Sequence, residues 1–489
     1  MAPETMIVVT LAIPFLGAAL VALAGRRPGL RDAVTLVTSA AMFAGVVTLL
    51  PAVLEGARPS VSLLEVIPGL ALAFTVEPLG MLFALVASGL WIVNSLYSIG
   101  YMRANREAKQ TRFYVCFALA LAATLGIAFA ANVFTLFLFY ELLTLITYPL
   151  VTHHGTEQAR LAGRVYLGVL LGTSVCLLLP AVVATWHVAG TTDFRPGGIL
   201  DGRLSAPALA GLLALYVLGI GKAAVMPVHR WLPAAMVAPT PVSALLHAVA
   251  VVKAGVFAIL KIGVYVFGAG AAEALRSVDW LPLVAAFTII AASIVALRSD
   301  NLKRRLAYST VSQLSYVVLA AALLTPLSII GAALHIATHA LGKITLFFAA
   351  GAIYTAAHKT EVSQLAGIAR RMPWTMAAFT VGALSLIGVP PAAGFVSKWF
   401  IFSGAVAGGH YLALAVLAVG TLLNAAYFLP IVYSAYFRRA EGGEHASHGE
   451  APWPMVAALV LTAGATLALI VVADVPLALA RQVASGFPG

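Results

Sequence analysis

The sequence predicts an all-α integral membrane protein with about 14 transmembrane helices, and two observations carry this prediction. First, 62% of the 489 residues are hydrophobic and only 10% are charged, whereas soluble domains carry about 25% charged residues. Second, apolar segments of about 20 residues, enough to cross a bilayer, recur along the whole chain. They lie at residues 5–24, 33–54, 79–101, 113–131, 133–152, 163–188, 206–226, 240–267, 280–298, 308–325, 327–356, 374–406, 410–436 and 453–473.

The basic residues support this number of spans. The loops after odd-numbered segments hold 19 of the 29 lysines and arginines, whereas the even-numbered loops and the C-terminal end hold five. Under the positive-inside rule, the odd loops are cytoplasmic, and both termini lie on the outer (periplasmic) side of a bacterial cytoplasmic membrane. This asymmetry also explains the net charge of +11 without a nucleic-acid partner.

The ends and loops of the chain carry weaker signals. The first apolar stretch has no basic region before it and no cleavage site, so we expect a retained first helix. The segment 55–77 is expected to be an outer loop with short strands. Cys116 and Cys176 lie in apolar runs, which favours packing residues over a disulfide. In the hydrophilic loop 438–454, a metal site at the two histidines is the alternative to a solvated loop. These histidines are His445 and His448.

Two predicted spans contain helix breakers next to a lysine. In the seventh, Pro227 and Pro233 follow Lys222, and in the twelfth, the segment 388–394 (GVPPAAG) precedes Lys398. Proline removes a backbone donor, and unpaired backbone at membrane depth is tolerated only against protein or a wet cavity. Broken helices at corresponding places in two halves indicate a transport site between inverted repeats. Two unrelated proline kinks with snorkelling lysines are the alternative.

Other ionisable side chains also lie in apolar segments, where each charge costs roughly 2.5–3.5 kcal/mol near the bilayer centre. Glu141 is alone in FTLFLFYELLTLITYPL, and we predict that Lys222 is its partner. A protonated glutamate bonded to a neighbouring helix is the alternative. Lys253 lies six residues after His247, and a buried lysine can exchange protons near neutral pH. The alternative for Lys253 is a structural ion pair.

A stripe of three titratable residues is predicted on the eleventh helix. His335, His339 and Lys343 recur every four residues in HIATHALGK, which places them on one face. Histidine titrates near physiological pH, so the stripe can pass protons between waters, although structural histidines remain an alternative. The HxxxH spacing also fits two zinc ligands, but neither a third ligand nor an HExxH glutamate is evident, so we predict no metal.

Together these residues predict one polar line from Glu141 through Lys222, Lys253 and the stripe to Lys398. Five further polar residues are predicted to support this line, although packing between helices explains the serines and the glutamine equally well. They are His229, His247, Ser309, Ser312 and Gln313. The sequence contains no phosphate-binding loop, dinucleotide fingerprint or CxxC cluster. We therefore expect no cofactor and no redox or hydrolytic site in this chain.

Several segments resemble the antiporter-like family, which comprises large membrane subunits of Mrp-type cation/proton antiporters, of complex I and of membrane-bound hydrogenases. The resemblance covers about residues 70–436. It is carried by KAAVMPVHRWLPAAMVAPTPVSALLHAVAVVKAGVF, ELLTLITYPLV, NLKRRLAYSTVSQLSY, LHIATHALGKITLFFAAG and GALSLIGVPPAAGFVSK.

The resemblance implies two inverted five-helix repeats at 113–267 and 280–436, after N-terminal helices at 1–112 and before a last helix and tail at 453–489. It implies that Glu141 pairs with the broken-helix lysine, Lys222. It further implies that Lys253 is the central lysine and Lys398 the terminal one, with the stripe on the eleventh helix as the connecting relay.

For function, the resemblance implies a proton-translocating subunit of a multisubunit monovalent cation/proton antiporter, such as a D-type Mrp subunit. Its partners would be other membrane subunits, the lipid bilayer and protons, with Na+ or K+ as the coupling cation. One alternative is a proton-pumping subunit of a complex I-like oxidoreductase or a hydrogenase, and another is a partner in bicarbonate uptake. The combination of His247 and Lys253 resembles the A-type and distal subunits, so the subfamily stays open.

Overall fold

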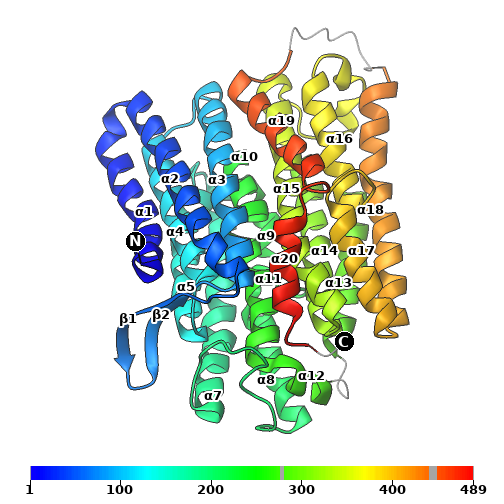
Figure 1. The fold of residues 1–489 in the computed structure, drawn as a ribbon. Coiled ribbons are helices and arrows are strands. Elements are labelled where there is room, and N and C mark those ends of the chain that lie inside the picture. Colours follow the sequence, from blue (N-terminus) through cyan, green and yellow to red (C-terminus); the bar gives the residue numbers. More distant parts are fainter. Residues whose placement is uncertain (1, 276–279, 440–448, 488–489) are drawn as a thin grey trace.

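A computed structural model describes residues 2–275, 280–439 and 449–487 as a bundle of transmembrane-length helices (Figure 1). Among these residues, 11 helices are long and apolar enough to cross a membrane, and four shorter apolar helices accompany them. Two of the shorter helices, Pro373–Ile387 and Gly394–Ala407, are the halves of one broken span. The described helices therefore form 14 spans, and the predicted number is confirmed. The chain is therefore an all-α, multi-pass membrane protein.

The N-terminal part consists of three long helices and a β-hairpin. These elements are α1 (Pro3–Leu23), α2 (Pro28–Leu54), β1 (Ser60–Ile67), β2 (Leu70–Thr75) and α3 (Pro78–Ala104). Each helix begins with proline, whose missing N–H costs nothing in the first turn. The strands pair antiparallel, which confirms the expected short strands. The Asn132 side chain donates to Ala71 O at 2.8 Å, so the hairpin is fixed to the following helices. The hairpin and the C-terminal end lie at the same end of the bundle (Figure 1).

The next group of helices surrounds the first break. It comprises α4 (Gln110–Ala128), α5 (Val133–Val151), α6 (Glu157–Thr173), α7 (Leu179–Ala189), α8 (Ala206–Gly219), α9 (Trp231–Ala234), α10 (Thr240–Ala244), α11 (Val251–Ile262) and α12 (Gly268–Leu275). Single π-helical turns join α6 to α7, α10 to α11, and α11 to α12. Residues Glu157–Ala189 and Thr240–Ala271 are each one long span, although the backbone leaves the helical conformation at Gly268, where φ is +68°.

The second group surrounds α15, which is almost entirely buried. It comprises α13 (Trp280–Arg298), α14 (Leu302–Leu323), α15 (Pro326–Ala357), α16 (Pro373–Ile387), α17 (Gly394–Ala407), α18 (Tyr411–Phe437), α19 (Trp453–Ala468) and α20 (Asp474–Ala484). The last predicted span, 453–473, is wrong in extent. Its helix ends at Ala468, and the chain resumes as α20, which packs on α3 and α15. The predicted tail thus contributes a helix that buries one face, made of Leu479, Ala480, Val483 and Ala484.

The seventh span breaks earlier than its prolines suggest, because α8 already ends at Gly219. The freed backbone groups find protein partners. Lys222 N donates to the Tyr140 hydroxyl at 3.1 Å, and Gly221 O accepts from Trp231 Nε1 at 2.9 Å. A Cβ on Gly255 of α11 would lie 2.3 Å from Ala223 N. Glycine there lets the broken segment pack directly against α11.

The twelfth span is interrupted where the sequence predicts it. Helix α16 ends with Gly388 in the left-handed region at φ +90°, and α17 begins at Gly394. Gly394 N donates to Ser385 Oγ at 3.1 Å, and the Lys398 amine donates to Ile387 O at 3.0 Å. A polar backbone break is thus satisfied inside the protein, as the low polarity of the bilayer requires.

Candidate polar axis

The predicted lysines and histidines form the core of the candidate site. Lysine is almost never fully buried unless it is paired, yet four lysines here are at most 4% exposed and two histidines are 1% exposed. They are Lys222, Lys253, Lys343, Lys398, His335 and His339. Their helices meet around α15, and we call this set of side chains the polar axis.

The first member, Lys222, does not form the predicted ion pair. Its Nζ donates to Tyr140 O at 2.8 Å and to Thr144 Oγ1 at 2.5 Å, and it lies 3.2 Å from the centre of the Tyr140 ring. Glu141 is only partly buried, and its Oε1 has no hydrogen-bond partner among the described residues. The two groups lie close enough to interact electrostatically. The predicted direct contact between Lys222 and Glu141 is therefore absent, and the amine has Tyr140 and Thr144 as its partners.

The second member joins the two halves of the bundle. Lys253 Nζ on α11 forms a short hydrogen bond with His339 Nδ1 on α15. His339 Nε2 and both ring nitrogens of His247 have no hydrogen-bond partner among the described residues. His247 is fully buried, and its ring lies 4.6 Å from the ring of Phe347. These three nitrogens are therefore available to further donors or acceptors.

A hydrogen-bonded network continues from Lys343. Its Nζ donates to Ser309 Oγ at 2.9 Å. The Tyr427 hydroxyl lies 3.0 Å from the same Ser309 oxygen and also contacts Asn424 Oδ1. Gln313 Nε2 donates to that Asn424 oxygen at 3.2 Å. Four side chains from α14 and α18 thus extend the axis beyond Lys343.

The same network reaches the second broken helix. The His335 ring lies 3.1 Å from Gln313 Oε1 through Nε2 and 2.9 Å from Ser397 Oγ through Nδ1. Thr338 Oγ1 lies 2.8 Å from the same serine oxygen. Lys398, the next residue, is bound at the end of α16, and its amine lies 4.8 Å from the Tyr316 ring centre. The structure therefore brings Lys343, His335 and Lys398 together through α14, α17 and α18.

Three steps along the axis are not bridged by direct hydrogen bonds between described side chains. They separate Lys222 from Lys253, His339 from Lys343, and His335 from Lys398, whose amine donates to Ile387 O and Thr421 Oγ1. The rings of His335 and His339 are 5.8 Å apart. Buried waters typically bridge polar groups that lack a direct partner inside proteins.

Two supporting residues lie off the predicted line. Ser312 is buried, but its hydroxyl pairs with Ser293 Oγ of α13 at 2.9 Å, so it packs two helices together. His229 lies in the broken segment beside Tyr308, with ring centres 6.1 Å apart, and its Nδ1 has no partner among the described residues. Ser309 and Gln313 lie on the axis as predicted.

Several residues of the axis were not predicted from the sequence. They are Tyr140, Thr144, Ser397, Asn424 and Tyr427. Asn424 was detectable, because a fully buried amide in an apolar run requires a partner. The hydroxyl residues give no such signal, since serine, threonine and tyrosine are common packing residues in transmembrane helices.

A further buried lysine has a structural role. Lys261 on α11 is 0% exposed, lies 3.1 Å from Glu77 and donates to Ala130 O at 2.9 Å. Glu77 also accepts from the Tyr265 hydroxyl at 2.9 Å and caps the start of α3. Each of these polar groups has a partner, so the ion pair between Lys261 and Glu77 fixes the start of α3, next to the hairpin.

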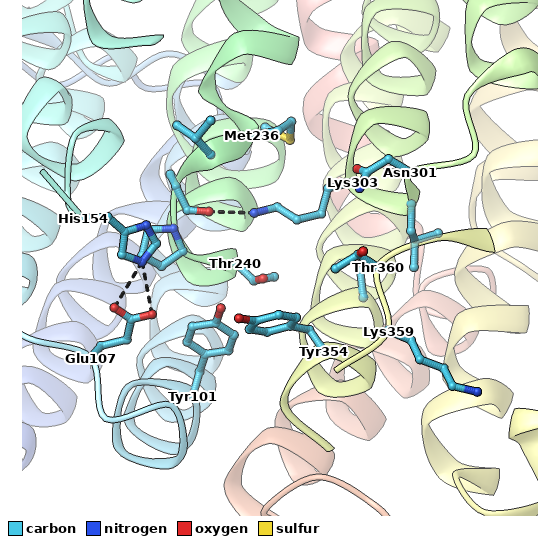
Figure 2. Close-up of a pocket in the computed structure, with 15 residues that line it drawn as sticks. Tyr101, Glu107, His154, Met236, Thr240, Asn301, Lys303, Tyr354, Lys359 and Thr360 are labelled. Atoms are coloured by element: carbon cyan, nitrogen blue, oxygen red, sulfur yellow. Dashed lines mark hydrogen bonds and ion pairs between the residues drawn. The ribbon is translucent and has the colours of Figure 1, made fainter. Parts of the chain in front are cut away.

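A polar pocket of about 250 Å³ opens among the loops that follow odd-numbered spans (Figure 2). Glu107 and His154 face each other across it at 3.3 Å. The hydrogen bond that the His154 ring donates to Glu107 raises the pKa of His154 above its ordinary value of 6.5. Lys303 on the opposite wall donates to Ala238 O at 2.6 Å. Thr240, at the start of α10, also lines the pocket.

The pocket lies at one end of a helical stripe that leads to the axis. Thr240, Ser243 and His247 follow each other by three and four residues, so they share one face. Ser243 is fully buried, and its hydroxyl has no partner among the described residues. His247 lies within electrostatic range of Lys303 at the pocket and of Lys253 on the axis.

Metal ligation has no support in the described part of the chain, where no group of three or more His, Cys, Asp or Glu side chains could hold an ion. His445 and His448 lie outside the described residues. Cys116 and Cys176 are unpaired, as the sequence predicts.

Comparison with known proteins decides the family. The model of the NADH:quinone oxidoreductase/Mrp antiporter transmembrane family matches residues 130–424, which include the four lysines and two histidines of the polar axis. The chain belongs to this family. The predicted resemblance is therefore confirmed.

The curated relatives include components of an NADH-quinone oxidoreductase, of a hydrogenase and of an antiporter. The chain is 35% identical to the N subunit of an NADH-quinone oxidoreductase of Desulforudis audaxviator, over 76% of this chain and 74% of the relative. It is 30% identical to component B of hydrogenase-4 of Escherichia coli, over 80% of this chain and 61% of the relative. It is also 31% identical to the A/B component of a probable K(+)/H(+) antiporter of Rhizobium meliloti, over 70% of this chain but only 34% of the relative.

Solved structures confirm the fold over the whole chain. A chain of the Mrp complex from Dietzia sp. DQ12-45-1b matches with a TM-score of 0.87 and 23% identity, covering 100% of this chain and 98% of that one. A chain of the membrane-bound sulfane sulfur reductase, an archaeal respiratory membrane complex, matches with a TM-score of 0.84 and 22% identity, covering 98% and 97%. Both are components of multisubunit membrane complexes.

Proposed function

We propose that this chain is the proton-translocating membrane subunit of a multisubunit monovalent cation/proton antiporter of the Mrp type. The observation that carries the proposal is the polar axis itself. It places four lysines and two histidines, nearly all fully buried, across the apolar interior of both helix groups. Burying so many titratable groups is costly in a membrane protein, and such groups mark ion and proton paths.

In this proposal the regions 113–267 and 280–436 act as two repeats that meet at Lys253 and His339. A proton moves along the axis from Lys253 through His339 and Lys343 to His335 and Lys398. Histidine can accept on one ring nitrogen and donate from the other, and buried waters carry the proton over the steps without direct hydrogen bonds.

The Lys222 site controls this movement in the proposal. The structure has Lys222 bound to Tyr140 and Thr144, with Glu141 separate. Approach of the Glu141 carboxylate would stabilise the charged amine, and separation would favour proton release. The described arrangement then corresponds to the separated state of a two-state switch.

We assign proton uptake to the pocket of Figure 2. Glu107 and His154 exchange protons with water at its wall, and the stripe of Ser243 and His247 leads from it to Lys253. The unpartnered groups along this stripe support the route. The positive-inside rule places this pocket on the cytoplasmic side of a bacterial membrane.

The test is cation-driven proton movement in membrane vesicles that contain the assembled complex. Lys222→Ala and Glu141→Ala should each abolish it without loss of the complex from the membrane. Native rates from both variants would refute the proposal.

A second candidate function is proton pumping in a redox complex. It is supported by the relative from an NADH-quinone oxidoreductase. The match covers 74% of that relative, compared with 34% of the antiporter relative. Electron transfer elsewhere in the complex would then drive the same axis. Purification of the native complex distinguishes the two, because flavin or iron–sulfur absorbance in it supports the redox complex and its absence supports the antiporter.

A further inference from the structure

A large basic cavity opens beside the second helix group, away from the polar axis. It measures about 1110 Å³ and lies among α14, the loop after α15 and the end of α18. Four lysine or arginine side chains and one histidine line it, against a single carboxylate. They are Arg305, Lys359, Arg438, Arg439, His358 and Asp300.

One carboxylate against four lysine or arginine side chains leaves this lining with a net positive charge. The Asp300 carboxylate accepts two hydrogen bonds from Ser363, one from its backbone N at 3.0 Å and one from its hydroxyl at 2.7 Å. Arg305 is 8% exposed and donates to Tyr427 O at 3.0 Å and to Ser299 O at 2.8 Å. A buried guanidinium that bonds only carbonyl oxygens keeps its full charge.

Two further arginines are free to bind a ligand. Arg438 and Arg439 are exposed, and within the described residues neither guanidinium donates a hydrogen bond. Arginine suits a phosphate group, because its planar fork can donate two parallel hydrogen bonds to it. The cavity therefore offers a fixed cation at its base and two adaptable ones at its rim.

An apolar groove continues from the cavity along the outward face of α18. It measures about 410 Å³ and shares Pro430 and Tyr433 with the cavity lining. Ala425, Leu429 and Tyr433 are spaced by four residues and share one face. Leu429 is 45% exposed and Tyr433 57% exposed, as expected of side chains that face lipid.

We propose that this cavity and groove bind an anionic phospholipid of the membrane, with its phosphate in the basic cavity and an acyl chain along α18. Basic pockets between transmembrane helices on the cytoplasmic side bind anionic lipid headgroups, and the loops around this cavity belong to the positive side of the chain. A soluble anion would match the charge but leave the groove unused. This lipid site is independent of the proposed proton transport.

The experiment measures lipid binding to the complete detergent-solubilised complex by native mass spectrometry. The complex is titrated with phosphatidylglycerol or, separately, with phosphatidylcholine. The test variant is Arg438→Gln with Arg439→Gln. The matched control is Arg26→Gln with Arg27→Gln, which removes two exposed charges from another loop of the same side. A third variant, Ala426→Trp, fills the apolar groove without changing charge.

We expect phosphatidylglycerol to bind more tightly than phosphatidylcholine. The test variant should weaken that binding about 25-fold, since each basic residue near the membrane contributes about fivefold. The Arg26/Arg27 control should stay within about twofold, and Ala426→Trp should also weaken binding. An unchanged affinity in the test variant, or equal binding of both lipids, would overturn the proposal.

Two further results would overturn it in favour of another occupant. If inorganic phosphate alone displaces phosphatidylglycerol at equal concentration, the cavity is a soluble phosphate site. If crosslinking from position 439 in the intact complex captures another protein of the complex and no lipid, the cavity is a contact between proteins.

Discussion

Lys253 and His339 form a hydrogen bond between α11 and α15, and among the described residues this bond joins the axis lysines of the first helix group to the axis residues of the second. Both side chains are at most 1% exposed. The neighbouring nitrogens of His247 and His339 are unpartnered among the described residues. A proton that passes from the first group to the second therefore has to use this contact in the proposed mechanism.

Lys253→Arg tests whether this contact carries a proton or only a charge. Arginine retains the positive charge but cannot be deprotonated, so we expect cation-driven proton movement in vesicles to fall by about 100-fold or more. The matched control is Lys261→Arg on the same helix. Its partner is Glu77, at 3.1 Å, and a guanidinium can keep that ion pair. A native rate for Lys253→Arg would contradict the assignment.

Asn424 links the two ends of the network in the second helix group. Asn424→Leu removes the acceptor that Gln313 and Tyr427 share, and each buried group left without a partner costs about 1–3 kcal/mol. We therefore expect a lower thermal unfolding temperature together with strongly reduced proton movement.

The control for this variant is Asn94→Leu. Asn94 is also 0% exposed, but its amide atoms have no hydrogen-bond partner among the described residues. Replacing an unsatisfied amide with an apolar side chain should leave stability unchanged or increase it. Equal effects of the two variants would show that Asn424 has only a packing role.

The sequence predicted the lysines and histidines of the axis for a simple physical reason. A charged side chain in an apolar span costs free energy that only a function or a partner offsets, so Lys222, Lys253 and Lys398 stand out. Tyr427 does not stand out, because its hydroxyl becomes part of the axis only when α18 packs against α14. The amide of Asn424 in an apolar run indicates a partner but does not identify it. The contacts between distant helices, and not local preference, decide which hydroxyl groups lie on the line.

The sequence located one of the two helix breaks correctly and the other only approximately. Proline marks a break within the sequence, and the segment 388–394 is interrupted as expected. The seventh span breaks at Gly219, before its prolines. This is possible because Tyr140 and Trp231 form hydrogen bonds with the backbone groups that the break leaves unpaired. Those partners lie on other segments, so the sequence of the span alone could not locate the break.

The structure gives Lys222 partners that the sequence did not predict, namely Tyr140 and Thr144. If Lys222 alternates between Thr144 and Glu141, Thr144→Val removes one of its two partners. Hydrogen bonds to charged groups contribute about 1.5–3 kcal/mol, so we expect proton movement to fall by at least about tenfold. Glu141→Gln should be more severe, and the double variant should be no worse than Glu141→Gln, because coupled residues are not additive.

Thr147→Val is the control for this cycle. Thr147 lies one turn further along α5, and its hydroxyl contacts Leu143 O and Tyr166 at 2.6 Å, not Lys222. Its effect on transport should simply add to that of Glu141→Gln. Additive effects of Thr144→Val and Glu141→Gln would exclude the proposed alternation.

The Glu107–His154 pair predicts a pH dependence at the uptake pocket. The hydrogen bond to Glu107 stabilises the imidazolium and raises the pKa of His154 above 6.5. The contribution of this pair to stability is therefore fully present below the ordinary pKa and is lost as the pH rises through the raised one. Diethyl pyrocarbonate reacts with neutral imidazole, and the His154 side chain is 39% exposed. Its modification, followed by mass spectrometry, should thus have its midpoint above pH 6.5.

Glu107→Gln should move this midpoint to lower pH, because the imidazolium loses the negative charge of its carboxylate partner. Lys359→Ala is the control, since Lys359 lines the same pocket but donates to Gln364 O at 2.9 Å, and it should leave the midpoint in place. If the pocket supplies protons to the axis, the pH dependence of transport in Glu107→Gln should shift in the same direction as the modification. A shift in the modification without one in transport would place proton uptake elsewhere on this face of the protein.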